Sequence, residues 1–281
     1  MATRTALSIR KVTPAIGAVV EGVDLADVDA DAAGAIRQAL FDHGVLFFPG
    51  QQRASVDQLW EFLEHFGTPW KDDSFGSDED GPQLVGDSDF QPTKSGTAVW
   101  HTDSSFLEKP TRFTLLRAMA MPDVGGDTCW ASMTAAYEAL HPSLREMLDG
   151  LSAVHTLEIP MACMGEYGDA FMAEHDRFHP RQQLHPMVAV HAETGRKALY
   201  VTESCTGRIE GVSPLESRHL LALLFEHIKS PDFNLRWRWS EGDVALWDNR
   251  KVQHYAVPDY DSPRVVQRIV VKGDRPLGPG S

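Results

Sequence analysis

A histidine and an aspartate lie two positions apart in the run Val99-Trp100-His101-Thr102-Asp103. Side chains two residues apart on an extended strand project from the same face, so both can reach one metal ion without a bend in the backbone. With a second histidine they would form a 2-His-1-carboxylate site, which leaves coordination positions on ferrous iron open for a cosubstrate and O₂. Because roughly one His-x-Asp triplet is expected by chance in a chain with 12 histidines, the hypothesis depends on a third ligand.

The best candidate for the third ligand is His254. It follows an apolar run over 244–247 and precedes a run that carries two arginines. The pair His191 and Glu193 has the same spacing as the first two ligands, but Gly195 follows closely and indicates a turn. Four other histidines fall in or at the ends of expected helices, where surface or packing roles are more common: His43, His65, His219 and His227.

The two arginines after His254, Arg264 and Arg268, are four positions apart in a β-like run. Such positions share one face of a strand, here expected to be the interior face of a β structure. A buried guanidinium needs an anionic partner, and its planar fork matches a carboxylate. The pair therefore predicts sites for anionic groups, unless both residues are ordinary surface charges on a strand.

The composition predicts an ordinary globular protein that does not bind nucleic acid. The chain has 281 residues, of which 42% are hydrophobic, enough for a sizeable core. Its 40 acidic and 26 basic residues give a net charge of −14, which repels polyanions but still permits a small anionic substrate beside buried arginines. The three cysteines have no CxxC spacing, and no apolar segment is long enough to be a signal or membrane span. We therefore expect a cytoplasmic protein with reduced thiols and no membrane contact.

Short apolar or alternating runs separated by Gly and Pro predict many strands. They cover residues 8–25 (two strands and a turn), 45–48, 113–121, 128–130, 152–157, 187–191, 196–201, 233–239, 244–247 and 265–271. The runs 113–121 and 128–130 are separated by a tight Gly-Gly turn, which predicts a hairpin. Helical spacing and capping signals predict helices over 29–43, 55–66, 132–148 and 213–229.

These elements favour a mainly β fold, in which helices decorate a double-stranded β-helix (jelly-roll) core. No linker or composition shift divides the chain, so we expect a single domain over residues 1–281. The stretches 68–98 and 158–185 are rich in turn-forming residues and show little periodicity. Long irregular connections in compact domains often carry function, so we expect both stretches to be loops that cover the site.

The order of these motifs resembles that of the Fe(II)- and 2-oxoglutarate-dependent dioxygenases typified by taurine dioxygenase and 2,4-dichlorophenoxyacetate dioxygenase. The resemblance rests on five sequence features that run nearly the whole length of the chain. They are Gly22-Val23-Asp24-Leu25, His101-x-Asp103, Gly125-Gly126-Asp127-Thr128, Trp247-Asp248-Asn249-Arg250 with His254, and Arg264 with Arg268.

The resemblance implies a set of residue roles. His101, Asp103 and His254 would bind Fe(II). Arg264, helped by the Thr128 hydroxyl, would hold the distal carboxylate of 2-oxoglutarate, and Trp247 would pack near this cosubstrate. Arg268 would hold the anionic group of the substrate.

The implied reaction consumes O₂ and 2-oxoglutarate, yields succinate and CO₂, and hydroxylates a small anionic organic substrate. A hydroxylated carbon that bears sulfur, oxygen or nitrogen would lead to cleavage of that C–S, C–O or C–N bond. Ascorbate is expected to stimulate turnover, and relatives of this kind suggest a homodimer or homotetramer. The retained Asp103 argues against a halogenase, which needs that coordination position for chloride.

Substrate contacts are expected from Asp72, Ser104 and Phe106 as well as Arg268. Trp70-Lys71-Asp72 stands where the taurine enzyme has sulfonate-binding histidines, so taurine is not the expected substrate. Asp72 would favour a substrate that also carries an amine. The run from His101 to Phe106 is closer to the aryloxyalkanoate branch of the family.

Two other classes of protein would show a similar triad. A jelly-roll protein that binds a metal and a ligand without turnover would form no succinate. A hydrolase or isomerase would prefer zinc and ignore O₂. The pairing of Arg264 with Thr128 favours the oxygenase over both.

Overall fold

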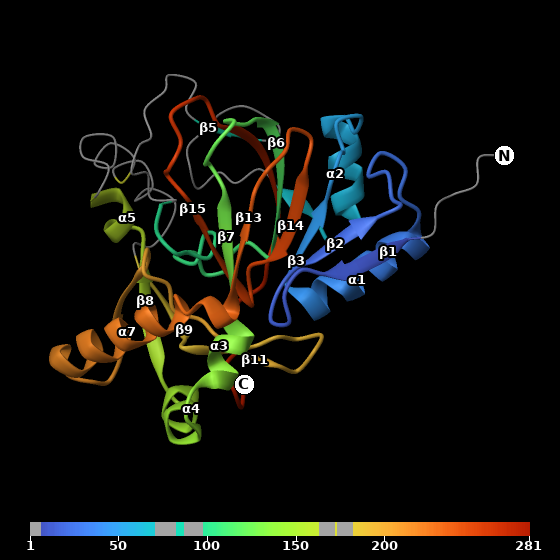
Figure 1. The fold of residues 1–281 in the computed structure, drawn as a ribbon. Helices are drawn as coiled ribbons and strands as arrows, with labels where there is room; N and C mark the ends of the chain where they lie inside the picture. The colour runs from blue at the N-terminus through green and yellow to red at the C-terminus, as the bar shows by residue number, and fades with distance from the viewer. Residues whose placement is uncertain (1–6, 71–82, 87–97, 163–171, 173–181) are drawn as a thin grey trace.

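The computed structural model of the protein describes residues 7–70, 83–86, 98–162, 172 and 182–281. Within these ranges the fold is mainly β, with helices packed outside the sheets (Figure 1). The strands are β1 (Ser8–Lys11), β2 (Ala18–Glu21), β3 (Val45–Phe48), β4 (Pro69–Trp70), β5 (Gln83–Gly86), β6 (Phe113–Ala120), β7 (Thr128–Ser132), β8 (Ser152–Thr156), β9 (Gln182–Pro186), β10 (Val188–Val190), β11 (Lys197–Leu199), β12 (Thr206–Ile209), β13 (Asn234–Trp237), β14 (Val244–Asp248), β15 (Val252–Ala256) and β16 (Val265–Val271). The helices are α1 (Ala30–His43), α2 (Val56–Glu64), α3 (Met133–Ala139), α4 (Pro142–Asp149), α5 (Glu158–Ala162), α7 (Pro214–Ile228) and the 3₁₀ turn η2 (Pro231–Phe233).

The main sheet has the strand order β1-β2-β3-β14-β6-β16-β4, and β5 also pairs with β16. All of these neighbours are antiparallel except β2 and β3. A second sheet, which we call the facing sheet, has the order β13-β7-β15. The strands that carry the predicted site residues therefore belong to two sheets that are assembled from distant parts of the chain.

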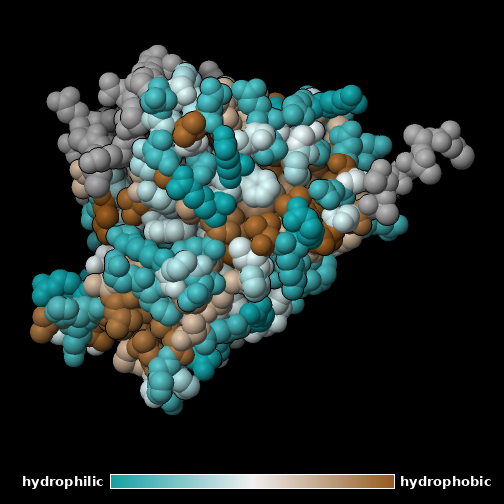
Figure 2. All heavy atoms as spheres, in the orientation of Figure 1, coloured by the Kyte–Doolittle hydropathy of each residue, from teal (hydrophilic) through white to brown (hydrophobic). Residues whose placement is uncertain are grey.

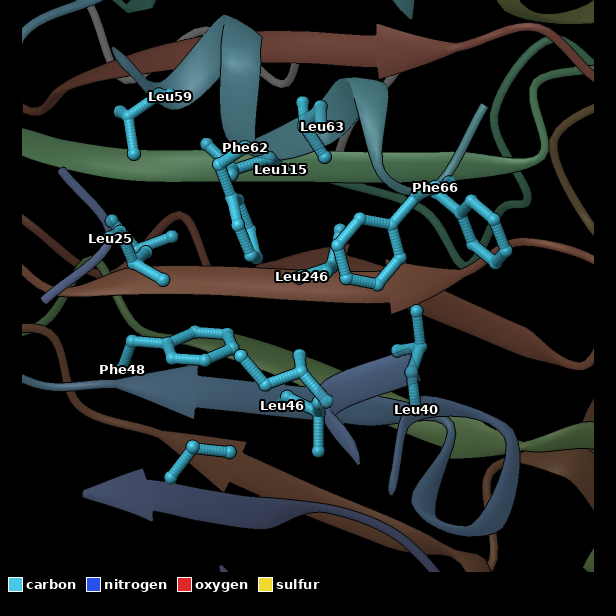
Figure 3. Close-up of a cluster of buried hydrophobic side chains, with 14 of the residues drawn as sticks. Leu25, Leu40, Leu46, Phe48, Leu59, Phe62, Leu63, Phe66, Leu115 and Leu246 are labelled. Carbon is cyan, nitrogen blue, oxygen red and sulfur yellow. The ribbon is translucent and has the colours of Figure 1, made fainter. Parts of the chain in front are cut away.

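Helices α1 and α2 cover one face of the main sheet. Figure 3 shows Phe62 and Leu63 of α2 over Leu115 and Leu246 of the central strands β6 and β14. All four side chains are almost completely buried. This apolar layer anchors the main sheet on the side away from the facing sheet.

The opposite face of the main sheet packs against the facing sheet. Trp130 of β7 and Trp247 of β14 are both fully buried, and their ring centroids lie 5.8 Å apart. Phe47 of β3 joins them, with its ring 5.3 Å from Trp130. This aromatic core fixes the separation between the two sheets, and with it the positions of residues that project from both.

A third group of elements lies below the two sheets in Figure 1. It contains the sheet β12-β8-β9, the hairpin β10-β11 and helices α3, α4 and α7. Helix α7 begins as predicted: Ser213 and Glu216 form a capping box, and Pro214 is its first residue. Figure 2 shows hydrophobic residues gathered at the lower left of this face, where Figure 1 places α7. Two leucines of α7, Leu215 and Leu223, are at least half exposed.

The predicted hairpin of the runs 113–121 and 128–130 is wrong. Strand β6 pairs with β14 and β16, whereas β7 pairs with β13 and β15 in the facing sheet. The connection between them therefore crosses from one sheet to the other. Gly125 and Gly126 both have positive φ values of 81° and 69°, which suits this crossover as well as a hairpin turn.

The expectation of irregular structure over 68–98 and 158–185 is also wrong for parts of both stretches. Strands β4 and β5 lie in the first stretch and pair with β16. Helix α5 opens the second stretch, and β9 closes it by pairing with β8. Most other residues of both stretches are outside the described ranges, so their role over the site stays a prediction. No helix in the part of the chain described here is long and apolar enough to cross a bilayer.

Candidate active site

His101 and His254 are paired through their backbones. The amide of His101 donates to the carbonyl of His254 at 3.0 Å, and the amide of His254 donates to the carbonyl of His101 at 2.9 Å. His254 lies in β15 of the facing sheet, so this bridge adds the His101 segment to the edge of that sheet. The two imidazole rings consequently lie side by side, with centroids 4.0 Å apart.

The carboxylate of Asp103 completes this cluster. Its Oδ1 lies 3.9 Å from Nε2 of His101 and 3.8 Å from Nε2 of His254. One ligand atom from each residue lies within 4.8 Å of the other two. Because nitrogen and oxygen ligands sit about 2.0–2.2 Å from a divalent metal, atoms at this spacing can close on one ion. The structure thus brings together the three residues that the sequence analysis named as candidate metal ligands.

The protonation state of the cluster also suits a divalent cation. His101 Nδ1 lies 2.7 Å from the carbonyl of Val99, so this nitrogen carries the proton and leaves the Nε2 lone pair free. Burial lowers the pKa of His101 and of His254, which keeps both rings neutral. Burial raises the pKa of Asp103, but the positive charge of Arg268 and a hydrogen bond from Thr114 act against it, and that pKa lies well below its usual range. Two neutral imidazoles and one carboxylate are the donor set of a facial triad.

Arg264 is buried beside Thr128, the residue that the family resemblance paired with it. Its Nε donates to the carbonyl of Gly126 at 2.8 Å, and its Nη2 donates to the Thr128 hydroxyl at 3.1 Å. Both acceptors are neutral, and burial lowers the pKa of the guanidinium. Within the described ranges no carboxylate accepts a hydrogen bond from Arg264. The residue is therefore a buried cation that can bind a carboxylate from a ligand.

Gly126 makes room for this arginine. Its φ of 69° lies in the left-handed region, and a Cβ at this position would approach Arg264 Cδ to 3.1 Å and Pro122 Cγ to 2.9 Å. The Gly-Gly turn therefore serves the arginine site as well as the crossover between the sheets.

Arg268 projects from β16 toward the cluster of His101, Asp103 and His254. Its Nη2 lies 3.4 Å from Asp103 Oδ1, and its side chain is 10% exposed. The two arginines thus both point inward, as their spacing predicted, but they reach different partners. Arg268 places a positive charge next to the cluster itself.

Two residues that the sequence did not single out contact the cluster. Thr114 of β6 donates from its hydroxyl to Asp103 Oδ2 at 2.6 Å, and the side-chain amide of Asn249 donates to Thr114 Oγ1 at 2.8 Å. Asn249 belongs to the Trp-Asp-Asn-Arg motif, which was the available signal, whereas nothing in the sequence marks Thr114. Trp247 of the same motif donates to Asn249 Oδ1 at 3.0 Å, and its ring centroid lies 4.6 Å from that of His254.

His191 lies outside the cluster of candidate metal ligands and takes part in a separate charged network. Its Nε2 lies 2.9 Å from Asp248 Oδ2, and both side chains are fully buried. Arg250 binds the same carboxylate through Nε and Nη2, and reaches Glu193 through Nη1. The ligand-like spacing of His191 and Glu193 therefore reflects a link between the β10-β11 hairpin and the turn after β14.

The remaining predicted substrate residues lie close to the cluster in sequence. Ser104 and Phe106 are buried, with 5% and 3% exposure. Ser104 has a φ of 54°, which turns the chain directly after Asp103. Phe106 packs in an apolar cluster with Leu157 and Met161. Asp72 lies outside the described residues.

Comparisons with known proteins agree with this geometry. Residues 8–270 match the family model described as "Taurine catabolism dioxygenase TauD, TfdA family". The chain is 36% identical to an alkylsulfatase of Acinetobacter baylyi, over 97% of this chain and 87% of the relative. It is also 36% identical to an alpha-ketoglutarate-dependent sulfate ester dioxygenase of Pseudomonas putida, over 97% of this chain and 91% of the relative.

The fold of this chain is also similar to that of a solved structure. A taurine dioxygenase from Burkholderia xenovorans superposes with a TM-score of 0.82 and 34% sequence identity, and covers 98% of this chain and 92% of that chain. The family match, the converged triad and the buried arginine point to one class of enzyme. The chain belongs to the TauD/TfdA family and is a 2-oxoglutarate-dependent non-haem iron dioxygenase.

Proposed function

We propose that His101, Asp103 and His254 hold Fe(II), and that Arg264 with Thr128 holds the distal carboxylate of 2-oxoglutarate. The observation that carries this assignment is the buried guanidinium of Arg264, whose hydrogen bonds go to neutral oxygens. It lies near enough to His254 to lower the pKa of that histidine further after burial and other charges have acted. In this proposal a dicarboxylate contacts the metal with one end and Arg264 with the other.

When bound, ferrous iron couples the decarboxylation of 2-oxoglutarate to the activation of O₂ and the hydroxylation of a substrate carbon. The protein supplies the geometry around that chemistry. Asp103 and the two histidines would supply the three protein ligands, and a site of this kind keeps coordination positions for the cosubstrate and O₂. The buried aromatic core behind them, with Trp247 against His254, keeps water from the protein side of the site. The pairing of the main and facing sheets fits a double-stranded β-helix, the fold that we propose for this core.

Arg268 is the residue that we propose binds the anionic group of the prime substrate. Its guanidinium is largely buried and lies 3.4 Å from the Asp103 carboxylate, so an anion held there would lie directly beside the proposed metal. The substrate class that we favour is a sulfate ester with an apolar chain. Two relatives at 36% identity are named for sulfate ester chemistry, and the apolar cluster around Phe106 follows the metal-binding segment directly.

The predicted reaction on such a substrate is hydroxylation of the carbon that bears the ester oxygen. The resulting hemiacetal-type product would release an aldehyde and sulfate as the C–O bond breaks, while 2-oxoglutarate is converted to succinate and CO₂. Taurine stays an unfavoured substrate. Asp72 retains its proposed role in binding an amine only if amine-bearing substrates are turned over.

The test is a panel assay for succinate formation and O₂ uptake with Fe(II) and ascorbate. The panel contains alkyl sulfates, alkyl sulfonates including taurine, aryloxy acids and amino acids. We expect succinate in stoichiometric amounts with aldehyde and sulfate from an alkyl sulfate such as hexyl sulfate. Turnover of aryloxy acids alone would overturn the substrate class, and succinate from none of the panel with bound metal would favour a non-catalytic binding protein.

Two accompanying proposals are tested with the same preparation. Ascorbate is expected to raise the number of turnovers by returning oxidised iron to the ferrous state. A homodimer or homotetramer is expected, and light scattering of the purified protein measures its mass directly.

A further inference from the structure

The two oxygens of the Asp103 carboxylate have different surroundings. Oδ1 faces Nε2 of both histidines and lies 3.4 Å from Arg268 Nη2. Oδ2 instead accepts a hydrogen bond from the hydroxyl of Thr114 at 2.6 Å. This length is typical of a charge-assisted O–H···O⁻ bond.

The direction of that hydrogen bond is fixed by Asn249 and Trp247. The indole N–H of Trp247 can only donate, so the Asn249 atom 3.0 Å away must be its oxygen Oδ1. The backbone N–H of Asp103 donates to the same oxygen at 3.3 Å. The amide nitrogen of Asn249 therefore faces Thr114 Oγ1 at 2.8 Å and donates to it. Because Thr114 accepts from Asn249, its own proton is left for Asp103.

The chain of donors is built into rigid parts of the fold. Thr114 on β6 and Trp247 on β14 are paired residues in the main sheet. Thr114, Trp247 and Asn249 are each at most 1% exposed, so water does not compete for these hydrogen bonds. The ion pair between Arg250 and Asp248 holds the turn on which Asn249 lies. The backbone N–H of Asn249 donates to the carbonyl of Arg112 at 2.9 Å.

We propose that this relay, from Trp247 through Asn249 to Thr114, keeps the Asp103 carboxylate monodentate. The Thr114 proton occupies Oδ2, which leaves only Oδ1 for the metal. A bidentate carboxylate would take one of the three positions that a chelating cosubstrate and O₂ require. Thr114 and Asn249 are thus positioning residues that act through Asp103. This inference rests on the metal site proposed above.

The first variant is Thr114→Val, which keeps the shape of the side chain but removes the proton from Oδ2. Co(II) is the probe, because its visible absorption depends on coordination number and needs no turnover. We expect Co(II) to bind with an altered absorption spectrum. The calorimetric Kd of 2-oxoglutarate for the Co(II) protein should rise by about tenfold to a hundredfold, the range found when outer ligand contacts are removed. Thr114→Ser restores the hydroxyl and should return the spectrum and the Kd to within about threefold of the wild type.

The second variant, Asn249→Asp, tests the direction of the relay. It keeps an oxygen for Trp247 and for the Asp103 amide but replaces the donor to Thr114 with an acceptor, which draws the Thr114 proton away from Asp103. We expect the same spectral change and weaker 2-oxoglutarate binding, although the Thr114 hydroxyl is still present. Thr134→Val is the matched control, because Thr134 is a buried threonine whose hydroxyl has no hydrogen-bond partner within the described ranges.

The outcomes separate the relay from the metal site. If wild-type protein binds no Co(II), or if Asp103→Ala binds it equally well, the proposed metal site is wrong. If the wild type binds Co(II) and Thr114→Val gives the same spectrum and the same 2-oxoglutarate Kd, the relay is wrong and the metal site stands. Thermal melting of each metal-free variant shows that it is folded. If Asn249→Asp does not fold, the comparison of Thr114→Val with Thr114→Ser tests the relay without it.

Discussion

Arg264 Nη2 donates to the hydroxyl of Thr128 at 3.1 Å, and that hydroxyl also accepts a hydrogen bond from Trp239 Nε1 at 3.0 Å. Thr128→Val would leave two buried donors without an acceptor and release the guanidinium from its position. Hydrogen bonds to charged groups contribute about 1.5–3 kcal/mol, so the Kd of 2-oxoglutarate should rise by about tenfold to a hundredfold. Calorimetry on the metal-loaded protein measures this. Thr128→Ser, which keeps the acceptor, should bind nearly as well as the wild type.

Arg268 and Arg264 are expected to bind different molecules. Arg268→Ala should weaken the binding of the prime substrate, seen as a higher KM of at least about tenfold, because it removes a charge-assisted contact. The Kd of 2-oxoglutarate should change by less than about threefold, since Arg264 is intact. Arg208→Ala is the control, because Arg208 is a surface residue whose side chain is 55% exposed. Equal losses for substrate and 2-oxoglutarate would contradict the division of roles.

Metal removal distinguishes an oxygenase from a zinc hydrolase. Treatment with a chelator should abolish succinate formation, and Fe(II) should restore it. Zn(II) should bind to the same three residues without restoring turnover, because it does not change oxidation state. Full activity with Zn(II) in the absence of O₂ would contradict the proposed chemistry.

The protein should lose stability as the pH falls below about 6.5, in part because of His155. Burial, followed by the neighbouring His185, lowers the pKa of His155 to about 3. Between pH 6.5 and 3 the unfolded chain therefore binds a proton that the folded protein excludes. Each such group reduces the free energy of unfolding by about 1.4 kcal/mol per pH unit across this window and leaves it unchanged above the window.

Urea denaturation at pH 7, 6 and 5 measures this dependence in the metal-free protein. His155→Phe should keep the packing against Tyr200, whose ring is stacked on His155 at 5.6 Å, while it removes the titrating group. The variant should be less stable at pH 7, because it loses the hydrogen bond between His155 Nε2 and Thr206 Oγ1 at 3.4 Å, but its stability should fall less steeply with acidification. The metal ligands His101 and His254 contribute equally to both proteins. Parallel pH dependences for the two proteins would show that His155 does not contribute.

The parts of the structure that the sequence predicted are those set by local signals. The capping box of Ser213 and Glu216 marks the start of α7 because its hydrogen bonds join residues three apart. The inward direction of Arg268 follows from strand periodicity, whereas Arg264 points inward from just before β16, where the register shifts between Val265 and Val266. The roles of Arg264 and Thr128 came from the family resemblance, and the structure places the two residues in contact.

The parts that the sequence did not predict depend on partners far along the chain. Strands β6 and β7 were expected to pair because a short turn joins them, but each has a better partner more than one hundred residues away. Thr114 carries no local signal, because its function comes from Asn249 and Asp103, which the sheets bring to it. His191 was correctly disfavoured as a ligand from the sequence, but its spacing did not reveal that Asp248 lies beside it.

The reciprocal backbone hydrogen bonds between His101 and His254 hold two of the proposed iron ligands together independently of the ion. Bringing these two residues together closes a long stretch of chain, which has an entropic cost. The formation of the sheets offsets this cost, so metal binding does not have to. We therefore expect the fold not to require iron, so that the ion can dissociate and rebind without unfolding the enzyme. Addition of Co(II) should raise the melting temperature only by the amount expected from ligand binding to the native state, in contrast to zinc fingers, whose folding requires the ion.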